Sequence, residues 1–255
     1  MKLAIIGRGA IAQYVARHAV ERGHEIASTI VRPEKVAPGY VASIADLPDD
    51  IDLIIDCAGH AALRQFGPDA LRAGYDVLTV SIGALADPAF EQELSDAGTQ
   101  GGASLTLASG AIGSLDTLRS ARVGPLNSVR YIGRKPPKGW IGSPAEQRID
   151  LAKMTGAAQT HFTGSARDAA LEYPKNANVA AAVALAGIGM DKTEVELIAD
   201  PNVSENIHEV HAEGAFGHFS FRIAGKSLPE NPRSSALAAM SVIGALDTLA
   251  SVIRF

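Results

Sequence analysis

The first half of the chain alternates short, continuously apolar runs with amphipathic stretches whose apolar positions recur every three or four residues. The apolar runs predict strands at Lys2–Ile6, Glu25–Val31, Leu53–Cys57, Asp76–Ser81 and Ser104–Leu107. The amphipathic stretches predict helices at about Ala10–Arg22, Ala61–Ala73 and Ala89–Gly98. Gly23 and Gly74 follow two of these helices, where a glycine commonly ends a helix. Strands that alternate with helices in this way favour a parallel sheet.

After Leu107 the pattern changes to a mixed order of strands and helices. Strand-like runs lie at Ser128–Arg134, His161–Ser165, Lys192–Ala199, His208–Gly214 and Gly217–Ile223. Helices are predicted at about Ala145–Leu151, Ala166–Tyr173, Asn178–Gly189 and, opened by Asn231-Pro232, Ser234–Ile253. We therefore expect an α/β protein in which residues 1–108 form a doubly wound parallel sheet and residues 109–232 an α+β domain. The C-terminal helix, within residues 233–255, is expected to complete the first domain.

A glycine-rich turn directly follows the first predicted strand. Gly7, Gly9 and Ala12 have the G-x-G-x-x-G/A spacing of a dinucleotide-binding (Rossmann) turn, in the required order of strand, turn and helix. Gly7 permits the tight turn, Gly9 lets the backbone approach a pyrophosphate, and Ala12 lets the helix pack closely on the strand. The N–H groups at the helix start, at Ala10 and Ile11, can hold the anion. The alternative is a glycine turn in an α/β domain that binds no nucleotide.

The end of the second predicted strand bears on which dinucleotide is bound. Domains that bind NAD usually place Asp or Glu there, where it binds the ribose 2′-hydroxyl. This chain has Ile30-Val31-Arg32 at that point and no acidic residue. The Arg32 guanidinium could pair with a 2′-phosphate, or it could be an ordinary solvated surface residue. The sequence thus permits NADP and does not require NAD.

The loop Asp56–His60, which carries Ala58 and Gly59, follows a predicted strand at the sheet edge where this class of fold binds ligands. Two further loops, Ser81–Ala84 and Ala108–Gly113, also directly follow predicted strands. Their small side chains would let a flat nicotinamide ring lie against the backbone, although ordinary tight turns have the same composition. Cys57 and His60 could form a nucleophile and base, but nothing nearby lowers the pKa of the thiol. We favour a buried strand end for Cys57 and a helix start near the cofactor for His60.

The candidate for proton transfer lies in the second half of the chain, at Asn206-Ile207-His208. Histidine titrates near neutral pH, and Asn206 and His208 project to one side of an extended segment. A lone histidine is more often structural than catalytic, and His211 and His218 lie nearby. The spacing of the three histidines does not place three ligands on one strand face, so we expect no metal site.

A basic run with two prolines, Arg134–Trp140, follows the first strand of the second half. Such a run is usually a solvated turn. It could also supply cations to a substrate that carries carboxylates, because ammonium and guanidinium groups form strong hydrogen bonds with carboxylates.

Composition narrows the class of protein. The chain has 255 residues, 47% of them hydrophobic, which suffices for two modest domains with their own cores. A single cysteine, Cys57, excludes an intramolecular disulfide framework and, with no signal-peptide pattern at the start, favours a cytoplasmic protein. The net charge of -5 argues against a general nucleic-acid surface, and no apolar run is long enough to predict a membrane span. We therefore expect small molecules as ligands, and neither nucleic acid nor a membrane.

Several short motifs, taken in their order and spacing, resemble the L-aspartate dehydrogenases that feed NAD synthesis, and the resemblance runs from end to end. The motifs are Gly7–Ile11, Ser109–Gly113, Arg134–Pro137, Tyr173–Ala180, Asp200-Pro201 with Asn206–His208, and Asn231–Ser235. The one departure is Ala12, where members of the family often have glycine. Because the dinucleotide turn accepts alanine at this position, little is put in doubt.

The resemblance implies an N-terminal Rossmann domain and an α+β domain that also forms a homodimer. It implies oxidation of L-aspartate with NAD or NADP to iminoaspartate, which hydrolyses to oxaloacetate and ammonia, and the reverse amination. It assigns the acid/base role to His208 and cofactor contacts to Ala111 and Asn178. For the two substrate carboxylates, Lys135 and Arg233 are candidate cations, and backbone groups near Ser81 and Asn206 are further candidates.

Two other classes of function remain open from the sequence. One is another two-domain Rossmann reductase, of the homoserine dehydrogenase or dihydrodipicolinate reductase kind. The other is a binding module that senses NAD(P) without catalysis, since a fold does not fix a function.

Overall fold

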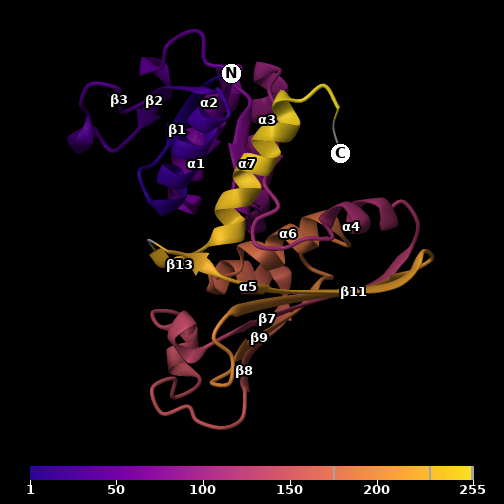
Figure 1. Cartoon of the computed structure of the whole chain (residues 1–255). Coiled ribbons are helices and arrows are strands. Elements are labelled where there is room, and N and C mark those ends of the chain that lie inside the picture. The colour runs from indigo at the N-terminus through magenta and orange to yellow at the C-terminus, as the bar shows by residue number, and fades with distance from the viewer. Residues whose placement is uncertain (175, 230, 254–255) are drawn as a thin grey trace. The chain divides into compact units, whose positions relative to one another are not determined.

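The computed structural model describes residues 1–174, 176–229 and 231–253, without the side chains of residues 232 and 233 (Figure 1). The chain divides into two compact units. Unit 1 comprises Met1–Gly110 and Ala238–Phe255, and unit 2 comprises Ala111–Leu237. No helix in the described part of the chain is long and apolar enough to cross a membrane.

Unit 1 is built on a six-stranded parallel sheet in the order β3-β2-β1-β4-β5-β6. Its strands are β1 (Lys2–Ile6), β2 (Glu25–Ile30), β3 (Tyr40–Val41), β4 (Leu53–Asp56), β5 (Val77–Thr79) and β6 (Leu105–Leu107). Its helices are α1 (Ala10–Glu21), α2 (His60–Arg72), α3 (Pro88–Gly101) and most of α7 (Ala236–Ala250). The strand order runs outward from β1 in both directions, which confirms the predicted doubly wound sheet.

The core of unit 1 explains how the two ends of the chain fold together. Leu3 and Ile5 of β1 lie in one buried cluster with Val15 of α1 and with Val242 and Leu246 of α7. Alternate strand residues point to the opposite face of the sheet, where α2 and α3 contact each other and α2 contacts β4 and β5. The sheet is therefore covered on both faces, as a parallel sheet of apolar strands requires.

Unit 2 is built on a mixed five-stranded sheet in the order β11-β10-β7-β9-β8. Its strands are β7 (Leu126–Lys135), β8 (Gln159–Ser165), β9 (Glu194–Ala199), β10 (Asn206–Gly214) and β11 (Gly217–Gly225). Its helices are α4 (Leu115–Ala121), α5 (Ala166–Glu172) and α6 (Asn178–Ala186). Helices α5 and α6 contact each other and pack on β7, β8 and β9 (Figure 1). A separate two-stranded sheet pairs β12 (Ser227–Leu228) with β13 (Asn231–Ser235).

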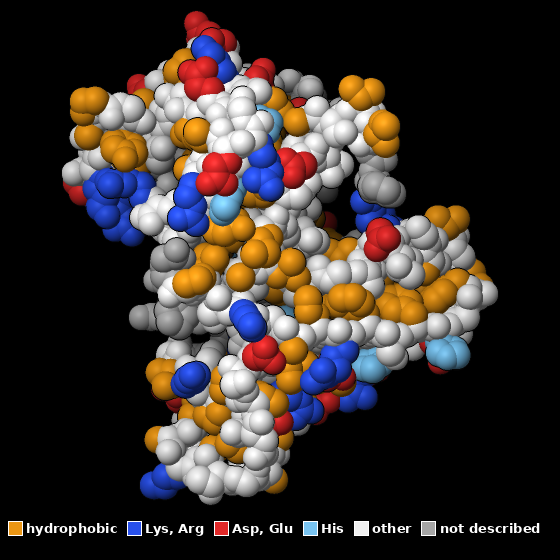
Figure 2. Space-filling model, in the orientation of Figure 1, with side chains coloured by type: hydrophobic (Ala, Val, Ile, Leu, Met, Phe, Trp, Pro, Cys, Tyr) orange, Lys and Arg blue, Asp and Glu red, His pale blue; other side chains and the backbone are white. Residues whose placement is uncertain are grey.

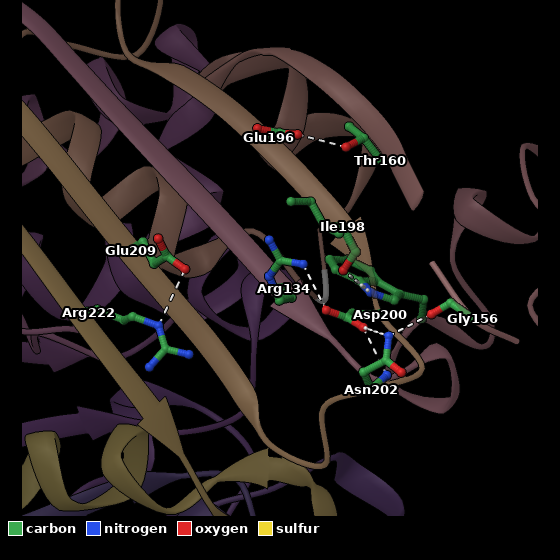
Figure 3. A network of polar contacts seen from close by, with 10 residues as sticks. Arg134, Gly156, Thr160, Glu196, Ile198, Asp200, Asn202, Glu209 and Arg222 are labelled. Carbon is green, nitrogen blue, oxygen red and sulfur yellow. Dashed lines mark hydrogen bonds and ion pairs between the residues drawn. The ribbon is translucent and has the colours of Figure 1, made fainter. Parts of the chain in front are cut away.

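The other face of this sheet carries a network of polar side chains (Figure 3). Arg134 of β7 donates to Asp200 at 2.8 Å, and Thr160 of β8 donates to Glu196 of β9 at 2.7 Å. The Asn202 side chain donates to the backbone oxygen of Gly156 at 2.6 Å. These contacts tie the loops at one end of the sheet to its central strands.

The edge strand β11 also carries hydrophobic side chains. Figure 2 shows a band of hydrophobic side chains along this strand, beside the hairpin that joins it to β10. At the hairpin the Phe216 side chain is 42% exposed, and its ring centre lies 6.0 Å from that of Phe219.

Two predicted helices differ from the observed ones. The prediction of a helix at Ala145–Leu151 is wrong, because the chain forms only a 3₁₀ turn at Pro144–Gln147. The Arg148 side chain instead donates to the backbone oxygen of His161 and to Glu172, contacts that hold the following turn against β8 and α5. The C-terminal helix begins later than predicted, because Asn231–Ser235 pair with β12 as strand β13.

Candidate active site

The glycine turn of unit 1 has the geometry that a dinucleotide requires. Gly7 follows β1 with φ +103°, and a side chain there would place its Cβ 2.8 Å from the Cβ of Ala58. A Cβ on Gly9 would meet nothing within 4 Å, so the space above this residue is open. Helix α1 begins at Ala10, and no side chain caps its first turn. The first N–H groups of α1, including that of Ile11, therefore suit an anion.

A buried carboxylate, which the sequence analysis did not single out, holds the two neighbouring loops. Asp56 is fully buried at the end of β4 and accepts hydrogen bonds from Thr79 Oγ1 (2.7 Å), from the Ala58 N–H (3.0 Å) and from Ser81 Oγ. Burial raises the pKa of Asp56, while these hydrogen bonds act in the opposite direction. One carboxylate thus positions Ala58 and Ser81, both of which are predicted to contact the cofactor. The sequence signal was an acidic residue that ends an otherwise apolar strand.

The loop after β4 does not support cysteine nucleophilic catalysis. Cys57 is buried, and burial raises the pKa of its thiol well above the ordinary value, so the thiol stays protonated. Gly59 has φ +96° and precedes α2, which begins at His60. The favoured interpretation, with His60 at a helix start, is confirmed.

Unit 2 brings His208 together with Tyr131. His208 is 3% exposed and lies opposite Gly133 in the register of β10 and β7, so it shares a sheet face with Tyr131. The Tyr131 hydroxyl lies 2.7 Å from Nδ1 of His208, and this is the only side-chain hydrogen bond of His208 among the described residues. Burial lowers the pKa of His208 to about 3, and the positive charge of Lys135 acts in the same direction. Burial raises the pKa of Tyr131, so the pair is neutral at physiological pH.

A pocket of about 710 Å³ in unit 2 contains Lys135 and Asn206. The Lys135 ammonium lies 4.8 Å from the centre of the Trp140 ring, and the Trp140 indole N–H donates to the backbone oxygen of Ile198 at 3.0 Å. Burial lowers the pKa of Lys135 to about 8. Among the described residues Lys135 forms no ion pair, and Glu172, an acid of the same pocket, bonds to Arg148 instead. The pocket therefore offers a cation that lacks an anionic partner within the described chain.

The remaining predicted residues fall into three groups. Ala111 is buried in the loop before α4, and Asn178 is the first residue of α6, both in unit 2. Arg32 is exposed two residues after the end of β2, and the side chain of Arg233 lies outside the described part of the chain. His211 bonds to Ser220 at 2.9 Å, away from His208 along β10. The described residues contain no group of three or more side chains that could hold a metal ion.

The amino-acid sequence of this chain is similar to known proteins along its whole length. Residues 116–249 match the C-terminal family of aspartate dehydrogenases, and residues 7–108 match the NAD-binding domain family of homoserine dehydrogenases. The chain is 52% identical to an L-aspartate dehydrogenase of Ruegeria pomeroyi, covering 100% of this chain and 94% of that one. It is 44% identical to an L-aspartate dehydrogenase of Ralstonia nicotianae, covering 99% of both chains.

A solved structure has the same fold. The crystal structure of aspartate dehydrogenase from Thermotoga maritima superposes with a TM-score of 0.81 at 29% identity, covering 100% of this chain and 99% of that one. The two sequence families, the full-length relatives and this structure agree with one another. The chain therefore belongs to the L-aspartate dehydrogenase family.

Proposed function

We propose that this protein oxidises L-aspartate with NAD or NADP to iminoaspartate, which hydrolyses to oxaloacetate and ammonia, and that it also catalyses the reverse amination. The observation that carries the proposal is the full-length similarity to L-aspartate dehydrogenases at 52% identity. The geometry supports it independently, because unit 1 has a dinucleotide turn and unit 2 has a buried histidine and a cationic pocket.

Unit 1 supplies the binding groups for the cofactor. When bound, the nicotinamide accepts a hydride from Cα of the substrate. We assign the pyrophosphate to the turn at Gly7 and Gly9 and to the N–H groups of Ala10 and Ile11, where the space above Gly9 is open. Ala58 and Ser81, which the Asp56 carboxylate holds, and Gly59 are the proposed contacts of the nicotinamide half. Ala111 and Asn178 are assigned as cofactor contacts from the family resemblance alone.

His208 is the proposed acid and base. With its Nδ1 held by Tyr131, the ring nitrogen left for chemistry is Nε2. In the tautomer that carries its proton on Nδ1, Nδ1 donates to the Tyr131 oxygen and the Nε2 lone pair can accept a proton. That proton comes from the substrate ammonium before hydride transfer, or from the water that attacks the iminium carbon afterwards.

Lys135 and Asn206 are the proposed ligands of the substrate carboxylates. The Lys135 ammonium is held over the Trp140 ring and has no anionic partner among the described residues, so a carboxylate can pair with it without displacing a protein group. With a pKa of about 8 it is mostly charged at neutral pH. We assign Arg233 to the same task from the sequence alone.

The test is turnover of purified protein with L-aspartate and either cofactor, followed by the absorbance of the reduced nicotinamide. The expected result is cofactor reduction with aspartate, and cofactor oxidation with oxaloacetate and ammonia. Replacing His208 with Gln is expected to lower kcat by about 10²–10⁴-fold, the usual contribution of a general base. Absence of turnover with both cofactors in both directions would refute the proposal, and full activity of the His208→Gln variant would remove that residue from its role.

A substrate panel separates the alternatives. Turnover with homoserine or with a dihydrodipicolinate-type substrate, and none with aspartate, would place the protein among the other two-domain reductases. Binding of NAD(P) in calorimetry without turnover of any amino or keto acid would indicate a sensing module.

We further propose that the protein is a homodimer assembled through unit 2. The support is the exposed apolar side chain of Phe216 at the hairpin that joins β10 to β11. Light scattering after size exclusion is expected to give twice the monomer mass. Replacement of Phe216 with Lys is expected to weaken the dimer, and a monomeric wild-type protein would contradict the proposal.

A further inference from the structure

The carboxyl ends of β1, β2 and β3 lie next to one another at one edge of the parallel sheet of unit 1. The Gly7 N–H donates to the Ile30 oxygen at 3.0 Å, and the Val31 N–H donates to the Val41 oxygen at 2.9 Å. Strand β2 lies between β1 and β3, so the first residues beyond each strand are neighbours along this edge. Arg8 comes two residues after the end of β1, and Arg32 comes two residues after the end of β2.

The Arg8 side chain extends across the end of β2. Its guanidinium carbon lies 4.7 Å from the centre of the Tyr40 ring, and Tyr40 belongs to β3, on the far side of β2 from Arg8. At this distance the guanidinium makes a cation–π contact with the ring, which supports the side chain while leaving its N–H groups able to donate to an anion. Figure 2 shows a group of Lys and Arg side chains on the side of unit 1 where Figure 1 places β2 and β3.

Neither arginine has an acidic partner among the described residues. Arg8 and Arg32 are both exposed, and neither forms an ion pair or a side-chain hydrogen bond there. The acid closest in sequence is Glu34, inside the turn Pro33–Lys35 that follows Arg32. The position from which an acidic side chain would bind a ribose 2′-hydroxyl is therefore occupied by cations.

We propose that Arg8 and Arg32 form a clamp for the 2′-phosphate of NADP, with Tyr40 as its platform, and that this protein prefers NADP to NAD. In a dinucleotide-binding fold the 2′ position of the adenosine ribose lies at the end of β2, the point that both arginines flank. Two guanidinium groups can pair with the phosphate oxygens through charge-assisted hydrogen bonds, which the free 2′-hydroxyl of NAD cannot match. The inference rests on the dinucleotide binding proposed above and is independent of the substrate.

The experiment isolates the phosphate from the rest of the cofactor. Calorimetry compares 2′,5′-ADP with 5′-AMP on the full-length protein, and nicotinamide fluorescence compares NADPH with NADH. We expect each phosphorylated ligand to bind about 10- to 100-fold more tightly than its partner, the range for a hydrogen bond to a charged group. Arg8→Gln and Arg32→Gln are each expected to weaken NADPH by about 10-fold and leave NADH nearly unchanged. Tyr40→Leu is expected to weaken NADPH selectively, because it removes the support of Arg8.

Arg17→Gln is the matched control. Arg17 also lies over an aromatic ring of unit 1, 5.8 Å from the centre of Tyr14, but on α1 rather than at the strand ends. This variant is expected to bind both cofactors as the wild type does. Equal wild-type affinity for 2′,5′-ADP and 5′-AMP would overturn the clamp, as would arginine variants that weaken NADH and NADPH alike. If neither dinucleotide binds the wild type, the proposed function itself fails.

Discussion

Two buried histidines of unit 2 should make this unit sensitive to acid. Burial lowers the pKa of His208 to about 3 and that of His161 to about 4, whereas both titrate near 6.5 in the unfolded chain. Between these values the unfolded chain binds protons that the folded unit does not, so stability falls as the pH drops through 6.5 towards 3–4. At pH 5 the unfolded histidines are almost fully protonated and the folded ones almost fully neutral.

The size of the effect follows from the proton linkage. Between pH 7.5 and pH 5, each histidine is expected to remove about 2 kcal/mol from the free energy of unfolding. This loss of unfolding free energy depends little on the exact pKa in the folded protein, provided that pKa lies well below 5. The folded histidine then binds almost no protons at pH 5, so the protonation of the unfolded chain sets the size of the loss. Together the two residues should cost unit 2 about 4 kcal/mol, a large share of the stability of an ordinary domain.

The only tryptophan of the chain makes the measurement specific to unit 2. Trp140 is fully buried, and its ring centre lies 4.3 Å from that of His161, so its fluorescence reports this unit during urea unfolding. In His208→Gln the difference between pH 7.5 and pH 5 is expected to shrink by about 2 kcal/mol. His218→Gln, which removes an exposed histidine of β11, serves as the control and should leave the difference as in the wild type. An undiminished pH dependence in His208→Gln would refute the reasoning.

Three further predictions concern the site. Gly7→Ala should abolish measurable dinucleotide binding and destabilise unit 1 by at least ~1–2 kcal/mol. The reason is that the new Cβ would lie 2.8 Å from the Cβ of Ala58 and that φ at this residue is positive. Calorimetry measures the binding, and thermal melting measures the stability. Tyr131→Phe should lower kcat without an equal rise in KM and change the kcat–pH profile, because His208 loses its partner; an unchanged profile would count against the pair. Lys135→Gln should raise KM for aspartate by about 10-fold or more, and full retention of wild-type KM would remove Lys135 from the carboxylate site.

Much of unit 1 could be predicted from the sequence, because its elements follow local rules. Strand β1 and the start of α1 lie where the apolar run and the glycine turn placed them. Positive φ at Gly23 and Gly74 agrees with their predicted places after helices. A parallel sheet buried on both faces has strands that are apolar throughout, and these contrast strongly with the amphipathic helices between them.

Unit 2 was less predictable where contacts distant in sequence decide the structure. The segment around Arg148 has a helical pattern, but contacts with His161 and Glu172, more than ten residues away, hold it as a turn. Strand β13 replaces the predicted helix start because it pairs with β12. His208 was predicted, while its partner Tyr131 was not, since 77 residues separate them and only the pairing of β7 with β10 brings them together.

Asp56 of unit 1 differs from His208 and Lys135 of unit 2 in how many hydrogen bonds and charged partners it has, and under the proposed function the difference bears on catalysis. Asp56 receives three hydrogen bonds and fixes the loops that are proposed to contact the cofactor. At the proposed substrate site His208 has one side-chain hydrogen bond, Lys135 has no acidic partner among the described residues, and burial lowers both pKa values. Under the proposed function a dicarboxylate pairs with Lys135, and its negative charge acts to raise the pKa of that group and of His208. We therefore expect substrate binding to make His208 a stronger base in the proposed mechanism.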